Sequence, residues 1–472
     1  MKLYISAIAL ASYLSAASAA AHKPYPGCID VDVAIIGGGS SGIHAAINLK
    51  DAGAKVAVIE KKSQIGGHAE TYVDPKTKIL TNIGVVVFED TPTVKKYFDR
   101  LGVPRVKNNV FQSAAAAKQY DFSLGIPIPQ DAQVAASTKQ AMASAMQAYA
   151  QNVLPKYPWI DQGYTFVPEP VPAELLQPFG QFAQQNNFSA ILPLIAQLNW
   201  YPGNITTIPA LYGLKKFGPG LLQSANNGFI VPKSGNTRSL YDAAASELGD
   251  SVYLNSNVVR VERNKAGVVV VVKQGGKTLT FRARKLLVAI PQTLKNVKSL
   301  DLSQSERDVF SKFSAVGYVC GVAEIPGLKS SLQNVGAFTP AHTPVIPGSN
   351  GYSQTGPPNQ FLLGVGFDNA DYTLADSEAV IRKELATLAA AGAVTADAAK
   401  KVKFPILSNH APFDLRVTSQ NIAKGFYADL LKLEGYRNTY WTGAVFAGHN
   451  SGLIWNWNND VIIPALKKDL GL

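Results

Sequence analysis

The stretch VDVAIIGGGSSG, residues 31–42, decides the fold. Its first six residues are mostly apolar and rich in β-branched side chains, which is typical of a buried parallel strand. The glycines that follow at once satisfy the pattern G-x-G-x-x-G with Gly37, Gly39 and Gly42. In this pattern the first glycine turns the chain out of the strand, the second leaves space for a pyrophosphate, and the third lets a helix pack closely. The stretch therefore predicts the start of a dinucleotide-binding sheet.

The residues after Gly42 complete a strand–helix–strand unit. A helix is expected over residues 41–52, and its N-terminus, which includes Ser41, presents free N–H groups to phosphate oxygens. A second strand over residues 55–59 ends at Glu60, where an acid accepts hydrogen bonds from the ribose of the adenosine. We therefore expect Glu60 and its neighbour Lys61 to contact the nucleotide.

A glycine doublet distinguishes FAD from NAD(P)H as the expected cofactor. Gly66 and Gly67 lie just beyond Glu60 and allow the backbone to meet the pyrophosphate a second time. The doublet resembles the one that follows the first nucleotide unit of the glutathione-reductase-like flavoproteins. No second complete G-x-G-x-x-G occurs in the chain, so nothing points to an NAD(P)H domain. The sequence therefore predicts FAD as the cofactor.

Two later blocks fit the same sheet. A helix is expected to begin at Ser234–Thr237, and five strands are expected after it, over residues 252–254, 257–261, 267–272, 278–281 and 286–291. Near the C-terminus, residues 440–443 are typical of a strand end and residues 447–455 of a turn that enters a last helix. The positive end of that helix would stabilise an anionic reduced flavin by roughly 1 kcal/mol.

Taken in this order, the blocks resemble the flavin-containing amine oxidase superfamily, and within it the fungal beta-cyclopiazonate dehydrogenase-like group. The resemblance is carried by residues 37–67, Gly84, residues 234–291 and residues 443–457. It implies an α/β fold, in which a Rossmann-type, GR2-like FAD-binding domain is interleaved with an α+β substrate domain. It also implies four further cofactor contacts, at Val258, Gly443, Leu453 and Ile454.

Two positions depart from the pattern of these relatives. Amine oxidases usually carry arginine after the glycine doublet, where this chain has His68. Their last strand usually ends in glycine followed by glutamate or threonine–glutamate, whereas Ala444 follows Gly443 here. The resemblance therefore implies flavin binding but does not support an amine as the substrate.

The predicted organisation alternates between the two domains. Three segments are expected to build the FAD-binding domain, namely residues 29–95, 226–298 and 426–472. A helical cap is expected over residues 96–225, and the sheet and helices of the substrate domain over residues 299–425. A further helix is expected near residues 420–433.

The N-terminus predicts export from the cell. Lys2 precedes an apolar run over residues 3–14, and small residues at 17–19 suit signal peptidase, so residues 1–19 are interpreted as a signal peptide. The alternative, a membrane anchor, requires about 20 apolar residues, and the run is shorter. We therefore expect a secreted protein without a transmembrane segment. Asn187 and Asn204 lie in glycosylation sequons.

The composition limits the kinds of ligand and redox group that the protein is expected to use. The formal charge is +11, but the basic residues are scattered and form no nucleic-acid motif, so a small organic substrate is expected rather than a nucleic acid. Cys28 and Cys320 are the two cysteines, and a disulfide between them is permitted but not implied. Without a C-x-x-C pair, a disulfide reductase is disfavoured. Histidine and cysteine are too scattered to predict a metal site.

Three residues are candidates for catalysis. A flavin itself carries out hydride transfer, so the protein mainly supplies orientation, a dry pocket and electrostatic tuning. His68 and Glu70 follow the glycine doublet, and either would position the substrate or move a proton. The alternative for His68 is a bond to a phosphate or backbone group. His449 lies in the turn before the last helix and would face the flavin ring. Three aromatic residues either line the flavin ring or belong to the core, which is favoured, namely Tyr440, Trp441 and Trp455. His410 is interpreted as structural.

Three functions remain open from the sequence. The leading hypothesis is an FAD-dependent oxidase or dehydrogenase that acts on a small, largely apolar organic molecule and passes electrons to oxygen or another acceptor. The second is a redox-neutral isomerase of an unsaturated carboxylate such as a fatty acid. The third is a flavin-binding protein without turnover.

Overall fold

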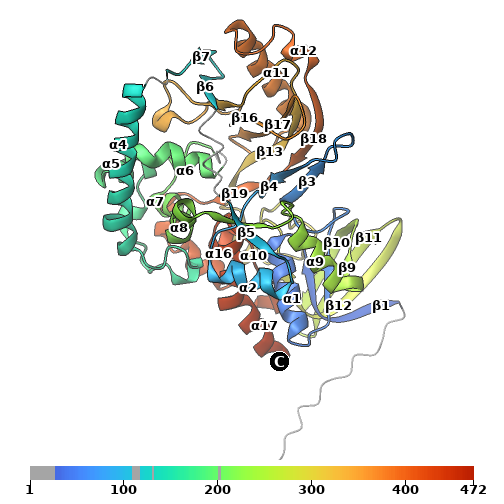
Figure 1. Cartoon of the computed structure of the whole chain (residues 1–472). Coiled ribbons are helices and arrows are strands. Elements are labelled where there is room, and N and C mark those ends of the chain that lie inside the picture. The colour runs from blue at the N-terminus through green and yellow to red at the C-terminus, as the bar shows by residue number, and fades with distance from the viewer. Residues whose placement is uncertain (1–26, 109–116, 130–131, 200–202) are drawn as a thin grey trace, which may run out of the picture.

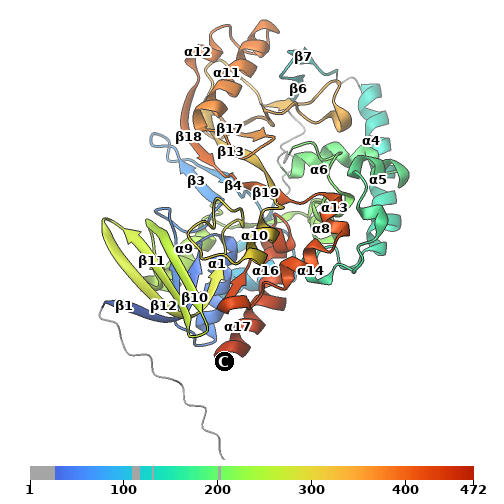
Figure 2. The same ribbon diagram turned by 180° about the vertical axis from the view of Figure 1, so that it is seen from behind.

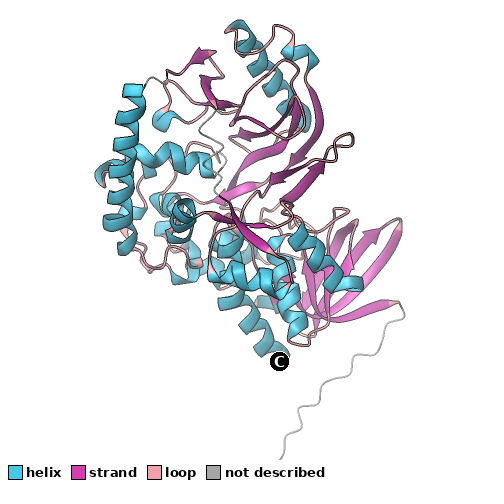
Figure 3. Ribbon diagram, in the orientation of Figure 1, coloured by secondary structure: helices cyan, strands magenta, loops and turns pink. Residues whose placement is uncertain are grey.

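The protein consists of two β-sheets and a group of helices beside them (Figure 1). The structure is a computed structural model, and it describes residues 27–108, 117–129, 132–199 and 203–472. The signal peptide expected over residues 1–19 lies outside the described residues. In Figure 3 the strands form the right-hand side of the lower lobe and the centre of the upper lobe, and the helices lie mainly to the left of both and at the top of the upper lobe.

The lower lobe contains a seven-stranded sheet with the order β10-β11-β12-β1-β2-β9, and β20 pairs with β12. Its parallel members are β1 (Cys28–Ile36), β2 (Val56–Ile59), β9 (Val252–Tyr253), β12 (Lys277–Val288) and β20 (Thr439–Trp441). Two antiparallel strands extend it, β10 (Ser256–Asn264) and β11 (Gly267–Gln274). Strands from three separate parts of the chain therefore build one sheet, which confirms the predicted Rossmann-type fold.

Strand β1 lies at the centre of this sheet because its side chains suit burial on both faces. Val33, Ala34 and Ile35 have no exposed surface. Helix α1 (Ser40–Asp51) follows β1 after the glycine loop and buries Ile43 and Ile47 against the sheet. Helices α9 (Ser239–Leu248) and α17 (Ile463–Leu470) pack against α1. The glycine loop is thereby held between a rigid strand and a packed helix.

Three sequence predictions differ from the structure. The strands expected over residues 278–281 and 286–291 are one continuous strand, β12, whose first half pairs with β11 and whose last residues pair with β20. The helix expected from Ser234 begins at Ser239, because the chain first turns at Gly235 (φ 74°). The helix expected near 420–433 is broken at Gly425 (φ 80°) into two short helices, α13 (Ser419–Ala423) and α14 (Phe426–Leu431).

The upper lobe contains a nine-stranded sheet with the order β18-β13-β17-β16-β14-β6-β7. Its long strands are β13 (Ser314–Glu324), β17 (Gln360–Phe367) and β18 (Lys403–Asn409), and β19 (Phe413–Arg416) pairs with the start of β13. Its shorter strands are β6 (Lys118–Asp121), β7 (Ile126–Pro127), β14 (Leu332–Asn334), β15 (Gly348–Ser349) and β16 (Gly351–Gln354). Helix α11 (Leu374–Ala390) buries Ile381 and Leu385 on one face of the sheet, and α12 (Ala398–Lys401) packs on α11.

A helical part lies to one side of both sheets, on the left in Figure 1 and on the right in Figure 2. Its helices are α4 (Ala132–Ala148), α5 (Phe179–Gln185), α6 (Leu192–Leu198), α7 (Ala210–Lys215) and α8 (Pro219–Asn227). The segment predicted as a helical cap, residues 96–225, also supplies β6 and β7 to the upper sheet, where β6 pairs with β14. It supplies β5 (Arg105–Asn108) as well, which pairs with β8 (Phe229–Pro232).

A hairpin connects the glycine doublet with the upper lobe. It consists of β3 (Ala69–Val73) and β4 (Leu80–Gly84) and was not predicted from the sequence. Helix α2 (Pro92–Arg100) follows and packs on α16 (Ser451–Trp457), which is preceded by the short helix α15 (Ala444–Ala447). The hairpin therefore reaches the upper sheet through β4 and β13, and α2 joins the first block of the chain to the C-terminal helix α16.

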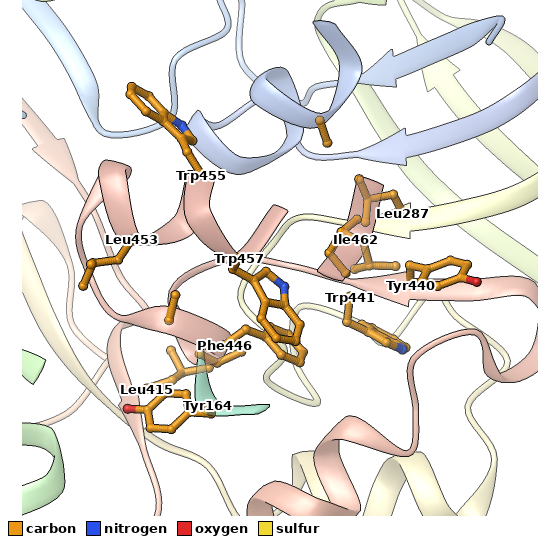
Figure 4. Packing of buried hydrophobic residues seen from close by; sticks show 14 of the residues in the cluster. Tyr164, Leu287, Leu415, Tyr440, Trp441, Phe446, Leu453, Trp455, Trp457 and Ile462 are labelled. Atoms are coloured by element: carbon orange, nitrogen blue, oxygen red, sulfur yellow. The ribbon is translucent and has the colours of Figure 1, made fainter. Parts of the chain in front are cut away.

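The core between these segments is aromatic. Trp441, Trp455 and Trp457 have no exposed surface. Trp455 lies against the N-terminal segment, where it stacks on His44, whereas Trp457 stacks on Phe446 (Figure 4). The expectation that Tyr440, Trp441 and Trp455 belong to the core agrees with this packing.

Candidate functional site

The glycine-rich loop has the geometry that its sequence predicts. A methyl group on Gly42 would lie 2.1 Å from the carbonyl oxygen of Gly37, so only glycine allows α1 to approach β1 this closely. Gly37 has a φ of 107°, which favours glycine at the turn out of the strand. A methyl group on Gly39 would instead meet nothing nearer than the Cα of Gly67, at 3.8 Å. The space above Gly39 is therefore open toward the doublet.

Glu60 closes one side of this loop. Its carboxylate is buried and accepts hydrogen bonds from the backbone N–H of Gly38 at 2.7 Å and of Lys62 at 2.8 Å. These bonds hold an ionisable acceptor at the end of β2, beside the glycines, where a ribose would be bound. Lys61, also predicted as a contact, is exposed at this edge. Val258, the position expected to meet the adenine, is half-buried at the bulge of β10.

The glycine doublet lies directly against the glycine-rich loop. The N–H of Gly66 donates to the carbonyl oxygen of Gly38 at 2.8 Å. A methyl group on Gly67 would lie 3.0 Å from the Cα of Gly39, and both doublet glycines have positive φ angles. The backbone thus approaches the loop from a second direction, as the sequence predicted.

Two helix N-termini meet at the same place. Helix α1 begins after Gly39 without a side-chain cap, and the hydroxyl of Ser40 lies 3.3 Å from that of Ser451 at the start of α16. The indole N–H of Trp455 donates to the Ser40 hydroxyl at 3.0 Å. Sequence reasoning missed Ser40 and Ser451. It favoured Ser41, whose hydroxyl is instead 2.7 Å from that of Thr442 and so connects α1 to the C-terminal segment.

Helix α16 is capped by its own sequence. The side-chain oxygen of Asn450 accepts the N–H groups of Gly452 and Leu453, and its backbone oxygen accepts the N–H of Ile454. The amides of Leu453 and Ile454, predicted to contact the cofactor, are therefore already bonded within the cap. Gly443, the fourth such position, has a φ of 124° and precedes α15.

These residues fit a flavin dinucleotide. An uncapped helix terminus and side-chain-free backbone at Gly39 and Gly67 suit the diphosphate, since free N–H groups and the helix dipole favour anions. Glu60 provides the acceptor for the ribose. The site is thus built from the first block of the chain together with residues of the doublet and the C-terminus.

The carboxylate of Glu70 is paired with charged and polar neighbours, so it is not a free acid that could exchange a proton with the substrate. This carboxylate is 2.6 Å from the ammonium of Lys62 and 3.8 Å from Nε2 of His410. Burial alone would raise the pKa of Glu70, but the neighbouring side chains of His410, Lys62 and Ser408 hold it well below its usual range. Glu70 is therefore a charged carboxylate that fixes its neighbours in position.

His68 connects the doublet with the upper lobe. Its ring stacks on that of His410, with the ring centres 4.3 Å apart. Burial lowers the pKa of His68 well below its usual value, and the neighbouring His410, His449 and Lys62 lower it further. The ring is therefore neutral at physiological pH, and because it is half-buried it retains surface for a ligand.

The segment from His410 to Arg416 joins three parts of the site and was missed in the sequence. His410, expected to be structural, packs on His68 and against Gly84. The ring of Phe413 contacts those of both His68 and His449, with ring centres at 5.8 and 4.2 Å. The candidates His68 and His449 are thus brought together at one phenyl ring. A short run that combines histidine, phenylalanine, aspartate and arginine is the one signal that could have identified this segment.

Several other residues lie outside this arrangement. Cys28 and Cys320 are not paired; Cys320 is buried in β13, and burial raises the pKa of its thiol to about 12. The described residues contain no group of three or more histidine, cysteine or acidic side chains placed to hold a metal. No helix in the described ranges has both the length and the apolar character needed to cross a membrane.

The fold and the site together define a flavoprotein with a GR2-type FAD domain. A profile of the flavin containing amine oxidoreductase family matches residues 40–323. The chain belongs to this family and is an FAD-dependent oxidoreductase, as the sequence motifs predicted.

Relatives with assigned names agree with this placement. The FAD-dependent oxidoreductase dpchF of Colletotrichum higginsianum is 53% identical over 451 residues, which cover 94% of this chain and 95% of the relative. The beta-cyclopiazonate dehydrogenase of Aspergillus flavus is 31% identical over 449 residues, covering 93% of each chain. The resemblance to the beta-cyclopiazonate dehydrogenase-like group is thereby confirmed.

Solved structures share the fold. The CLA-producing fatty acid isomerase from P. acnes aligns with a TM-score of 0.72 and 19% identity, over 92% of this chain and 98% of that one. Cyclohexylamine oxidase from Brevibacterium oxydans aligns with a TM-score of 0.61 and 16% identity, over 94% and 100% of the two chains. Because one fold carries both chemistries, this likeness does not choose between them.

Proposed function

We propose that the protein is a secreted oxidase or dehydrogenase that removes a hydride from a small, largely apolar organic molecule and passes the electrons to oxygen or another acceptor. One observation carries the proposal. Beside the glycine doublet, the neutral rings of His68 and His449 both pack on Phe413, which gives an aromatic, uncharged surface for a hydride donor. Bound FAD supplies the hydride acceptor, and these side chains orient the substrate and exclude water.

The electron acceptor follows from what the chain contains. The sequence has no second dinucleotide fingerprint and no C-x-x-C pair. A nicotinamide-binding domain and a dithiol relay therefore have no residues to build them. Molecular oxygen or a separate acceptor is the remaining route for the electrons.

The experiment uses the purified, yellow protein under anaerobic conditions. A panel of apolar ring compounds, each with an oxidisable C–H next to nitrogen or oxygen, is screened for bleaching of the flavin band. We expect at least one compound to bleach the flavin, and air to restore the colour with release of peroxide. If a dye must be added to restore it, the protein is a dehydrogenase. A folded protein that takes up no FAD would refute the proposal.

The isomerase remains the competing function. It is separated from an oxidase by the product, which has unchanged mass when no acceptor is consumed. Mass spectrometry of the products formed from conjugated and unconjugated unsaturated acids, with oxygen uptake followed in parallel, distinguishes the two. A flavin that no compound in either panel reduces or turns over would favour a binding protein.

Export is supported by the signal-like N-terminus and by the surface position of two sequons. Asn187 and Asn204 are both exposed, and the side chain of Asn204 accepts hydrogen bonds from the N–H and hydroxyl of Thr206. Expression in a eukaryotic host should yield medium-borne protein that begins near Ala20 and shifts on a gel after glycosidase treatment. Protein that retains residues 1–19 inside the cell would contradict export.

A further inference from the structure

His449 is held in a single tautomer. Its Nε2 atom accepts a hydrogen bond from the backbone N–H of Asp414 at 2.8 Å. A nitrogen that accepts from an amide carries a lone pair, so the proton of the neutral ring is on Nδ1. Burial lowers the pKa of His449 to about 4, and the ring is therefore neutral at physiological pH. It presents one fixed N–H donor.

That donor is unused within the described part of the chain. The hydrogen bond to Asp414 is the one that the ring makes there, and Nδ1 has no partner among the described residues. Neighbouring side chains surround the ring of His449, which packs on Phe413, while part of the residue remains exposed to solvent. It lies two residues before Ser451, which meets Ser40 at the start of α1. A free donor is thus present at the junction of the C-terminal turn, β19 and the nucleotide loop.

Charged side chains around His449 are predominantly positive. The ammonium of Lys216 lies 2.9 Å from the carboxylate of Asp414, and Nε of Arg416 lies 3.5 Å from the same carboxylate. Of the titratable groups that act on the ring, Lys216 and Arg416 are cations, Asp414 is the anion, and His68 is neutral. The balance is one positive charge in a largely buried setting, where charges interact more strongly than in water.

We propose that His449 is a specificity-determining residue whose Nδ1–H, backed by the Lys216–Asp414–Arg416 cluster, binds an ionised oxygen of the substrate. The substrate is then a largely apolar molecule with one acidic group, either a carboxylate or an enolate. This inference rests on the proposed function, because it assumes a small-molecule site beside the flavin. It concerns binding, so it holds for an oxidase and for an isomerase.

The test compares pairs of ligands of similar shape and different charge. Benzoate is compared with benzamide, and 1,3-cyclohexanedione, an enolate at neutral pH, is compared with cyclohexanone. Binding to the FAD-loaded full-length protein is measured by titration calorimetry and by perturbation of the flavin spectrum. We expect at least one anion to bind roughly tenfold or more tightly than its neutral partner, as one hydrogen bond to a charged group provides. Whichever pair shows the difference identifies the acidic group.

Two substitutions assign the effect to Nδ1. In His449→Asn the side-chain amide nitrogen can occupy the position of Nδ1, whereas His449→Leu removes the donor. We expect the preference for the anion to be retained in His449→Asn and lost in His449→Leu. Because the ring is neutral, the preference should also be constant between pH 6 and 8.5.

Other outcomes overturn the proposal. Equal affinities for both members of each pair in the wild type would do so, as would an unchanged preference in His449→Leu. A preference that disappears as the pH rises through 6 to 7, in wild type but not in His449→Asn, would show an imidazolium instead of a neutral donor. If His449→Leu does not fold, comparison of His449→Asn with His449→Gln decides, since glutamine places its nitrogen near Nε2. If the protein binds FAD but shows none of these preferences, only the inference about His449 is rejected. A wild-type protein that binds no FAD would reject the proposed function as well.

Discussion

The ammonium of Lys216 lies 2.9 Å from the carboxylate of Asp414, and both side chains are buried where the end of α7 meets β19. Burial lowers the pKa of Lys216. Burial alone would raise the pKa of Asp414, but Lys216 and Arg416 hold it below its usual value. Lys216 and Asp414 form a buried ion pair, in which each charge offsets the cost of burying the other. The pair connects the helical part to the segment that carries Phe413.

Breaking this pair is expected to destabilise the protein. Lys216→Met leaves a buried carboxylate without its nearest cation, which typically costs about 3–5 kcal/mol in the free energy of unfolding. The double variant Lys216→Met/Asp414→Asn removes both charges, so it should recover a large part of that loss. Denaturant unfolding of the FAD-loaded proteins, followed by circular dichroism, measures both values.

An exposed pair provides the control for this prediction. Lys295 and Asp371 are 3.0 Å apart with side chains 80% and 84% exposed, so water and salt screen their attraction. Lys295→Met should unfold like the wild type. A double variant less stable than Lys216→Met would contradict the idea that compensation between the two charges sets the cost.

A second prediction separates two glycines of one motif. Gly39→Ala adds a methyl group that meets no atom nearer than 3.8 Å, at a residue whose backbone is extended, so the chain should fold. The same methyl group occupies space that the pyrophosphate needs. We therefore expect a folded, colourless protein with FAD affinity reduced at least about a hundredfold, or nearly 3 kcal/mol. FAD is removed by unfolding and refolding the protein, and the affinity is then measured from flavin fluorescence as FAD is titrated back.

Gly42→Ala tests the other function of a glycine in this loop. Its methyl group would lie 2.1 Å from the carbonyl oxygen of Gly37, so β1 and α1 must separate. This variant should lose stability whether or not FAD is present. Normal FAD binding by Gly39→Ala would show that the cofactor does not approach the backbone there.

The nucleotide half of the site was predictable because its signals are local. The apolar strand, the glycine spacing and Glu60 lie within thirty residues, and each has a geometric reason that the structure reproduces. The doublet was predictable for the same reason, since Gly66 and Gly67 both have positive φ angles and a methyl group on Gly67 would lie 3.0 Å from the Cα of Gly39. Helix and strand ends were less accurate where a single glycine, such as Gly235 or Gly425, turns the chain.

The part of the site around His68 and His449 was not predictable, because its contacts join segments that are distant in the sequence. His68 stacks on His410, and His449 is oriented by the backbone of Asp414. The lysine that follows α7 and the aspartate in β19 show no pattern in sequence that indicates a buried pair. Sequence reasoning named His68, Glu70 and His449 from their neighbours in the chain. It had no means to find the partners that determine their protonation.

A third prediction concerns acid sensitivity. His44 is buried on α1 and stacks on Trp455, and burial lowers its pKa to about 3. In the unfolded chain the ring takes up a proton below about 6.5, whereas the folded protein excludes it until far lower pH. Stability is therefore complete above pH 6.5 and falls as the pH decreases, by about 1.4 kcal/mol per pH unit from this residue. His44→Phe should flatten the pH dependence of unfolding between pH 6.5 and 5 by that slope.

The neighbours of His44 keep this variant interpretable. The side chains of Asn48 and Asn458 also donate to backbone oxygens, of His44 and Ser41, so a phenyl ring leaves neither amide without a bond. The exposed His342 serves as the matched control, and His342→Phe should retain the slope of the wild type. An unchanged slope in His44→Phe would mean that the ring is protonated in the folded state.

The last prediction concerns Glu89, a buried acid beside α16, whose contribution to stability decreases as the pH rises. Glu89 and Asp161 both approach the Cα of Gly220, where a methyl group would lie 2.9 Å from Oε2 of Glu89 and 3.2 Å from Oδ2 of Asp161. Burial, and then the charge of Asp161, raise the pKa of Glu89 to about 8 against the hydrogen bond from Asn450, which caps α16. Glu89 is therefore neutral in the folded protein at pH 7.

Because the unfolded chain loses this proton near pH 4.5, the folded state binds one proton more between about 4.5 and 8, and stability falls as the pH rises through that window. Glu89→Gln is neutral at every pH, so relative to wild type it should gain roughly 4–5 kcal/mol between pH 4.5 and 8. Thermal unfolding of the FAD-loaded proteins across this range measures the gain. The exposed acid Glu378 on α11 is the control, and Glu378→Gln should follow the wild type. Parallel stability curves for Glu89→Gln and wild type would show that Glu89 is ionised in the native protein, and with it that the cap of α16 lies beside a charge.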